Sequence, residues 1–213
     1  MQVAFVRSLS ILTGLKKHEP PTFSSDMKRP ENLDKWYDLF VAIDPILQSI
    51  NSLGDCIDYD TMQRYRHLKR KVASWKKIPL ASIMGIHSSH FLNVAVHANQ
   101  LPSKPHKDGL SSHLGYDGIC AVGPFEYAWL CFPHLGIRIK VRKLDVVLLR
   151  GTALFHHMYW WKGQGRFVIV PFADRHLFPV FRVRRPKKMS PVFGDKWADF
   201  RASYPSKPLN TFL

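Results

Sequence analysis

Cysteine and acidic residues are both scarce in this 213-residue chain, and it contains no long apolar run. The three cysteines form no CxxC pair, so we expect reduced thiols and neither a disulfide framework nor a zinc site. Apolar segments such as 167–173 are far too short to span a membrane. Arg7 interrupts the apolar start of the chain, so we expect no signal peptide there. These absences favour a soluble, intracellular protein without membrane association.

Positive charge is what the sequence has in excess. It contains 31 Lys and Arg against 16 Asp and Glu, which gives a net charge of +15 at pH 7. Such an excess predicts attraction to a polyanion, with nucleic acid first and an anionic membrane surface second. The alternative is a basic protein with no nucleic-acid partner. Apolar residues make up 46% of the chain, so we expect a folded globule, and its basicity suggests the nucleus.

Two helices are expected in the first third of the chain, after a loop or linker that ends at Pro20-Pro21. Apolar residues recur at helical spacing over 32–51, although Pro45 interrupts the pattern. A second helix is expected over 59–75. Its basic residues are Arg64, Arg66, Lys69, Arg70 and Lys71. A charged helix face is usually just solvated, but a run of one sign fits a surface that meets phosphates equally well.

From residue 80 onward the pattern changes to short segments rich in β-branched and aromatic residues, separated by Gly, Pro and Ser. The expected strands are 91–97, 116–122, 127–132, 137–141, 145–149, 155–160 and 167–172. Short strands at such close spacing predict a β-sandwich or barrel. The chain therefore divides into a helical extension (1–79), a β-domain (80–181) and a basic, exposed tail (182–213).

The triplet His106-Lys107-Asp108 is the first part of a candidate metal site. Residues i and i+2 of an extended segment point to the same side, so this histidine and carboxylate can bind one ion. An HxD triplet alone is weak evidence, because it arises readily by chance. A histidine pair, His156-His157, follows an apolar strand and a glycine turn. Neighbours on a strand point oppositely, so only one of the pair can bind; we favour His156 for its spacing to Arg166, with His157 as the alternative.

Two histidines and one carboxylate with open coordination positions are the ligand set of non-haem Fe(II) oxygenases. The open positions must take a bidentate co-substrate and then O₂. A distal carboxylate on that co-substrate needs a fixed cation, and arginine provides the two parallel hydrogen bonds that lysine lacks. Arg166 opens the expected strand 167–172 and occupies a suitable place. The order HxD, distal histidine, arginine thus predicts an iron-dependent oxygenase.

Taken in order, these motifs resemble the TET/JBP branch of the 2-oxoglutarate-dependent dioxygenases, in particular the set expanded in basidiomycete fungi. The resemblance covers roughly residues 91–177. The matching segments are 101–102, 106–109, 115–118, 130–139, 145–151, 156 and 165–166. The resemblance implies an α+β fold, in which the N-terminal helices pack on a double-stranded β-helix of the jelly-roll or cupin type.

The resemblance also implies an activity. Fe(II) would be held by His106, Asp108 and His156, and 2-oxoglutarate would reach Arg166. With O₂ the enzyme would oxidise a methylated base flipped out of DNA, which is DNA demethylation chemistry. In this family an aromatic residue six positions after the arginine stacks on the flipped base. Phe172 occupies that position, and ordinary core packing is the alternative role for it.

Asp174 departs from the family, which commonly has a base-binding histidine two positions after the aromatic residue. An ionised carboxylate only accepts hydrogen bonds, so it favours the exocyclic amine of cytosine or adenine. The substrate base therefore stays open between 5-methylcytosine and N6-methyladenine. Two other functions remain as alternatives: a catalytically inactive DNA-binding module of the same fold, and a 2-oxoglutarate-dependent protein hydroxylase. We expect a monomer.

Overall fold

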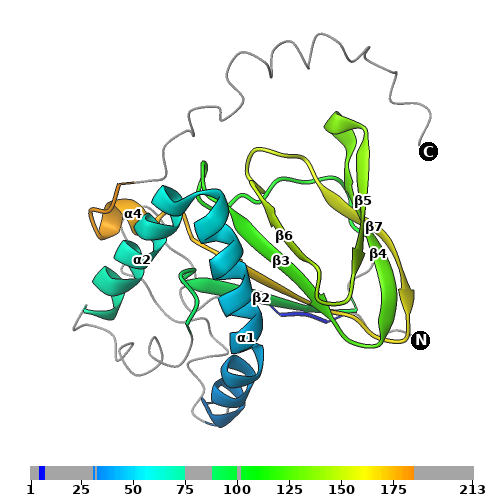
Figure 1. Ribbon diagram of the computed structural model, residues 1–213, viewed down its shortest axis with the longest axis horizontal. Coiled ribbons are helices and arrows are strands. Elements are labelled where there is room, and N and C mark those ends of the chain that lie inside the picture. The colour runs from blue at the N-terminus through cyan, green and yellow to red at the C-terminus, as the bar shows by residue number, and fades with distance from the viewer. Residues whose placement is uncertain (1–4, 8–30, 32, 75–87, 100–101, 185–213) are drawn as a thin grey trace.

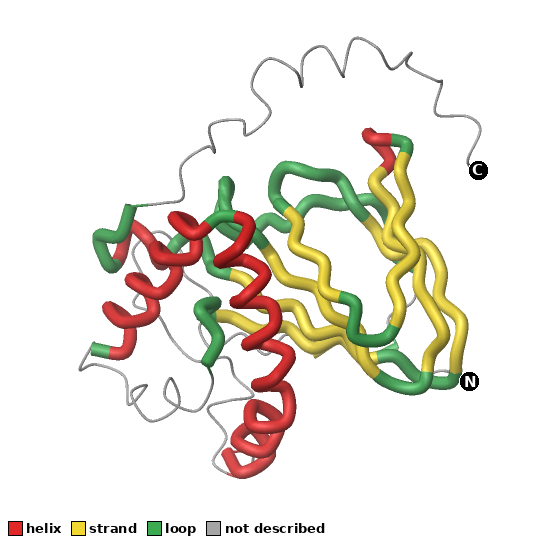
Figure 2. The backbone as a smooth tube through the Cα atoms, in the orientation of Figure 1, coloured by secondary structure: helices red, strands yellow, loops and turns green. Residues whose placement is uncertain are grey.

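The computed structural model describes residues 5–7, 31, 33–74, 88–99 and 102–184 (Figure 1). Two long helices, α1 (Leu33–Ile57) and α2 (Tyr59–Ala73), lie together on one side of the β-structure (Figure 2). The strands are β1 (Phe5–Arg7), β2 (Asn93–Ala98), β3 (Asp117–Val122), β4 (Phe125–Phe132), β5 (Ile137–Arg142), β6 (Val146–Leu149), β7 (His157–Gly163) and β8 (Phe167–Phe172). Two short helical turns complete the described chain, η2 (Pro133–Leu135) and α4 (Leu177–Val180).

The strands form two antiparallel sheets, one of order β1-β2-β8-β3-β6 and one of order β5-β4-β7. Helices packed on this jelly-roll core confirm the predicted α+β fold. All seven expected strands are present, and β7 begins at His157 and continues to Gly163. The N-terminal loop prediction was wrong for 5–7, because β1 pairs with β2 at the sheet edge. The proposed division of the chain at residues 80 and 182 stays a prediction.

The helix α1 corrects the expectation that Pro45 interrupts it, since it runs through this proline and ends at Ile57. Proline lacks the N–H that would bond one turn back, which normally breaks a helix. Here Pro45 lies on the exposed side, while Ile43, Leu47 and Ile50 are buried. Tertiary burial of that apolar face outweighs the missing hydrogen bond. None of the helices in the described ranges is both long and apolar enough to span a membrane.

The helix α2 begins at a capping residue, because the Asp58 carboxylate accepts from the backbone N–H of Thr61 at 3.1 Å. Its basic side chains divide into two groups. Arg66 pairs with Asp55, and Lys69 donates to the Ser89 carbonyl at 2.8 Å, so both serve the fold. Burial lowers the pKa of Lys69 to about 8. Arg70 and Lys71 are exposed and can meet phosphates, whereas 75–77 lie outside the described residues.

Tyr65 joins α2 to the β-core. It is 1% exposed, and its hydroxyl donates to the Tyr116 carbonyl at 3.2 Å and accepts from the Tyr116 N–H at 2.9 Å. Its ring also meets Phe91 edge-on, with centroids 5.1 Å apart. The tyrosine thus satisfies backbone groups that lie just ahead of β3, which begins at Asp117.

Tyr65→Phe is expected to lower the free energy of unfolding by about 1–3 kcal/mol, because it leaves buried backbone groups of Tyr116 without the hydroxyl. Urea denaturation measures this directly. Tyr37→Phe is the matched control, because Tyr37 is 54% exposed and should show no change. Equal midpoints for the wild-type protein and Tyr65→Phe would contradict the assigned contact.

Candidate functional site

A cavity lies between the two sheets. The five-stranded sheet contributes inward-facing residues from β2, β3 and β8, and the three-stranded sheet contributes them from β4, β5 and β7. The residues that line it are His97, Ser103, His106, Asp108, Asp117, Ile119, Ala128, Leu130, Val141, His156, Met158, Arg166, Val168 and Val170. Its walls are apolar, and its polar groups come from a few positions along the sequence.

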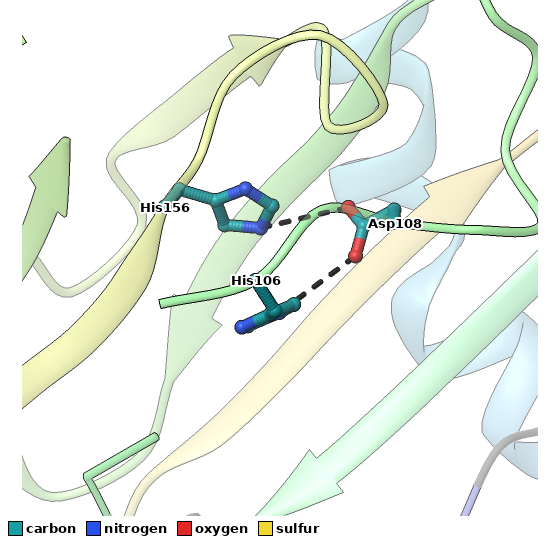
Figure 3. A group of neighbouring side chains, drawn as sticks. All are labelled: His106, Asp108 and His156. Atoms are coloured by element: carbon teal, nitrogen blue, oxygen red, sulfur yellow. Dashed lines mark ion pairs between the residues drawn. The ribbon is translucent and has the colours of Figure 1, made fainter. Parts of the chain in front are cut away.

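Backbone pairing brings the HxD segment and the distal histidine together. His106 and His156 form an isolated antiparallel bridge, with two N–H···O bonds of 3.0 Å each. The Asp108 N–H donates to the Gly151 carbonyl at 3.0 Å, which fixes the carboxylate beside them. The Asp108 oxygens lie 3.8 Å from His106 Nε2 and 3.5 Å from His156 Nε2 (Figure 3). One possible ligand atom from each of the three residues lies within 4.8 Å of the others.

Both imidazole rings are oriented by their own backbone. His106 Nδ1 is 2.9 Å from the Lys104 carbonyl, and His156 Nδ1 is 3.0 Å from the Leu154 carbonyl. A carbonyl oxygen only accepts, so each Nδ1 donates and the neutral ring keeps its lone pair on Nε2. Each Nε2 faces Asp108. Histidines that bind metals commonly show this arrangement, in which the second nitrogen donates to a fixed acceptor.

His157 does not join the group. It is half-buried, and its Nδ1 lies 3.1 Å from the Ser103 carbonyl. As the neighbour of His156 at the start of β7, it points to the other side of the strand. Of the two histidines that the sequence left open, the structure brings His156 together with His106 and Asp108. Two nitrogen donors and one carboxylate fit a divalent iron centre with open positions.

Gly151 makes room for two carboxylates. A Cβ atom at this position would overlap carboxylate oxygens of both Asp108 and Asp117. Asp117, on β3, is 2% exposed, and burial together with the Asp108 charge raises its pKa well above the usual range. That shift favours a protonated carboxyl against Asp108. Asp117 was not among the site residues predicted from the sequence, because residue type alone does not distinguish a buried carboxyl from a solvated one.

Arg166 is a buried cation held by its backbone. Its N–H donates to Asn99 Oδ1 at 2.8 Å, and its carbonyl accepts from the Asn99 N–H at 2.7 Å. The residue is 5% exposed, and its Nε and Nη1 have no hydrogen-bond partner within the described part of the chain. Burial lowers its pKa to about 10, so it remains charged at neutral pH. The Phe125 ring lies 5.9 Å from the guanidinium carbon, but a buried charge with two unsatisfied donors is still unfavourable, so the guanidinium is suited to an anionic ligand in the cavity.

His97 is a second polar group of the cavity that was not predicted from the sequence. It lies directly opposite Val168 in the β2–β8 ladder, and so is a diagonal neighbour of Arg166 on the cavity side. Its Nδ1 is buried, with no partner among the residues described. Burial and the charge of Arg166 lower its pKa, which favours a neutral ring. Its only signal in the sequence was its place on an expected strand.

Phe172 and Asp174 lie at the end of β8, next to the cavity. The strand alternation puts Phe172 on the same side as Val168 and Val170, where it is 9% exposed. Asp174 is 3% exposed and bridges Ser111, which follows the HxD segment closely. Its Oδ1 accepts from the His176 N–H at 2.8 Å, and burial raises its pKa. Neither residue is among the described residues that line the cavity, so their substrate roles stay predictions.

Comparison with known proteins identifies a shared fold. No family model matches the chain, and no curated protein matches it. The solved structure of NgTET1 in complex with 5mC DNA superimposes with a TM-score of 0.55 at 15% identity, covering 86% of this chain and 64% of that one. An RmlC-like cupin protein from Desulfovibrio desulfuricans and Fe(II)-HppE with an alternative substrate cover 37% and 38% of the chain, with TM-scores of 0.28 and 0.25, too low to support an argument. The chain therefore has a TET-like fold and spans about 64% of the NgTET1 structure.

Proposed function

We propose that this chain is an Fe(II)- and 2-oxoglutarate-dependent dioxygenase that oxidises a methylated base in DNA. One observation carries the proposal. His106, Asp108 and His156 converge at a cavity that also contains the buried, unpaired donors of Arg166. A metal-binding triad beside a fixed cation meets the needs of a metal ion and an anionic co-substrate together.

The protein residues would bind, orient and shield the reactants. The Nε2 atoms of His106 and His156 and the Asp108 carboxylate would hold iron. Arg166 would hold the distal carboxylate of 2-oxoglutarate, with the neutral His97 as a further hydrogen-bond partner. The apolar side chains around them would exclude water. When bound, iron with 2-oxoglutarate and O₂ supplies the oxidising power for a methyl C–H that no side chain provides.

Three observations support DNA as the substrate. The chain carries a net charge of +15 at pH 7, and the similar NgTET1 structure contains 5mC DNA. Lys104 and Lys107, close in sequence to His106 of the cavity lining, are both exposed and suited to phosphates. A base must leave the duplex to reach such a cavity, and that costs a few kcal/mol. Stacking on Phe172 would offset about 1–3 kcal/mol of it.

The identity of the base depends on Asp174. Its ionised carboxylate accepts hydrogen bonds, and burial, which raises its pKa, moves it toward the protonated form that can also donate. A group of this kind can serve either the exocyclic amine or a ring acceptor, so both 5-methylcytosine and N6-methyladenine fit. Membership of the basidiomycete-type TET/JBP set, which rests on the motif resemblance, and a nuclear location, which rests on the charge, belong to the same proposal. A monomeric state is proposed with them.

The direct test is succinate formation from 2-oxoglutarate with Fe(II) and ascorbate, in the presence of matched oligonucleotides. The panel contains 5-methylcytosine, N6-methyladenine or no modification, with a methylated peptide set as the control for a protein hydroxylase. We expect turnover that one modified base stimulates, with loss of that base from the oligonucleotide. Iron-loaded protein that turns over with none of the oligonucleotides would overturn the proposal, and stimulation by peptides alone would assign the protein hydroxylase instead.

A further inference from the structure

The sheet β5-β4-β7 has a second face, turned away from the cavity. Its inner face contributes Ala128, Leu130, Val141 and Met158 to the cavity lining. Residues directly opposite one another in adjacent strands share a face. Trp129 lies opposite Lys140 on one side and Trp160 on the other, and Tyr127 lies opposite Arg142. We call the outward residues Tyr127, Trp129, Trp160, Arg138, Lys140 and Arg142 the outer-sheet face.

The cations of this face form a row. In β5, Arg138, Lys140 and Arg142 alternate with Ile137, Ile139 and Val141, so the three cations share one side. All three are exposed. Alternate residues of a strand are about 7 Å apart, a spacing close to that of successive phosphates along an extended single strand. The row therefore matches a polyanion that lies along β5.

Aromatic side chains lie beside the row. The Tyr127 ring meets Trp129 at 6.1 Å and Trp160 at 5.8 Å between centroids, both edge-on. Trp160 is 43% exposed, although core packing would favour its burial. Arg138 lies 4.8 Å from the Trp129 ring centroid, and Lys140 lies 4.2 Å from that of Tyr127. An exposed cation–π contact is weaker than a stacked base, so these cations can move to phosphates and leave the rings to bases.

We propose that the outer-sheet face binds single-stranded nucleic acid, with bases stacked on the aromatic rings and phosphates on the β5 cations. Single strands present the unpaired bases that such rings need, whereas a duplex hides them in its stack. Acidic groups on this side are already engaged among the described residues. Glu126 pairs with Lys162 at 2.9 Å, and Asp145 accepts from the Arg142 N–H at 2.7 Å. The face is separate from the cavity, so binding there needs neither iron nor 2-oxoglutarate.

The test measures binding of the full chain to a labelled, unmethylated single-stranded 12-mer by fluorescence anisotropy across salt concentrations, without iron or 2-oxoglutarate. The triple variant Arg138→Gln/Lys140→Gln/Arg142→Gln is expected to bind at least about tenfold more weakly. Its slope of log K against log salt should fall by about 2, because three phosphate contacts are lost at roughly 0.7 each. The matched control, Lys35→Gln/Arg175→Gln/Arg184→Gln, removes the same charge from exposed positions outside the outer-sheet face and should keep the slope.

The aromatic contribution is tested separately. Trp160→Ala is expected to weaken binding roughly tenfold, whereas Trp160→Phe should largely restore it, because stacking needs a ring rather than an indole. Thermal unfolding monitored by circular dichroism confirms that each variant is folded. Equal losses in the two triple variants would show general electrostatic attraction and overturn the proposal. The proposal would also be overturned if Trp160→Ala kept the wild-type affinity for the 12-mer, if a duplex of equal length bound more tightly, or if the wild-type protein did not bind.

Discussion

Replacing Asp108 with alanine is expected to abolish succinate formation while leaving DNA affinity within about twofold of wild type. The carboxylate lies between the two imidazole Nε2 atoms, at 3.8 and 3.5 Å, so it contributes the only negative charge of the triad. Removing a partner outside the ligand set already weakens metal binding by roughly 10–100-fold, so the loss of a ligand should exceed that range. The proposed phosphate contacts involve other residues, so DNA binding should be retained.

The measurement pairs Fe(II) or Mn(II) titration with an anisotropy assay on duplex DNA. Asp38→Ala is the control, because Asp38 is an exposed carboxylate on α1, outside the cavity lining. In metal-free protein, Asp108→Ala should not lower the free energy of unfolding, because it relieves the contact between two carboxyl groups at Gly151. Loss of metal binding, DNA binding and stability together would instead mean that Asp108 is structural.

The strands could be predicted from the sequence because apolar and polar residues alternate within them and Gly or Pro residues separate them. It missed β1, since three residues that gain stability only by pairing with β2 carry no pattern of their own. The sequence also predicted an interruption of the helix at Pro45. The helix α1 continues through it because its opposite face is buried, which is a tertiary effect that local sequence does not show. Local propensity was right wherever the local pattern and the packing agreed.

The candidate site shows the same division. The HxD spacing and the distal histidine can each be recognised from a short stretch of sequence. The backbone bridge between His106 and His156 then brings the two segments together in the fold. His97 and Asp117 carry no such signal, because their importance lies in burial: an unpaired Nδ1 in one, a raised pKa in the other. Both become visible only when strands far apart in sequence enclose the same cavity. The ligand roles themselves stay a prediction.

Replacing Arg166 with methionine is expected to remove most of the affinity for 2-oxoglutarate. Loss of one partner from a buried charge pair costs about 2–5 kcal/mol, which is roughly 30- to 5,000-fold in the dissociation constant. Arg166→Lys should recover only part of it, because an ammonium group lacks the planar fork. His97→Phe should lose about tenfold or less, because a neutral hydrogen bond contributes only about 0.5–1.5 kcal/mol.

Calorimetric titration with 2-oxoglutarate in the presence of Mn(II), without O₂, separates these variants from effects on turnover. Methionine matches the apolar stem of arginine, so the ligand-free variant should be at least as stable as the wild-type protein, since it removes a buried charge with two unsatisfied donors. Addition of 2-oxoglutarate at 100 times its dissociation constant should stabilise the wild-type protein by about 2.7 kcal/mol and leave the stability of Arg166→Met almost unchanged.

Equal affinity for 2-oxoglutarate in the two proteins would assign the buried guanidinium to another anion, whereas a destabilised ligand-free variant would show that Arg166 serves the fold. The combination of unchanged or raised stability with lost affinity is what a cation reserved for a ligand requires.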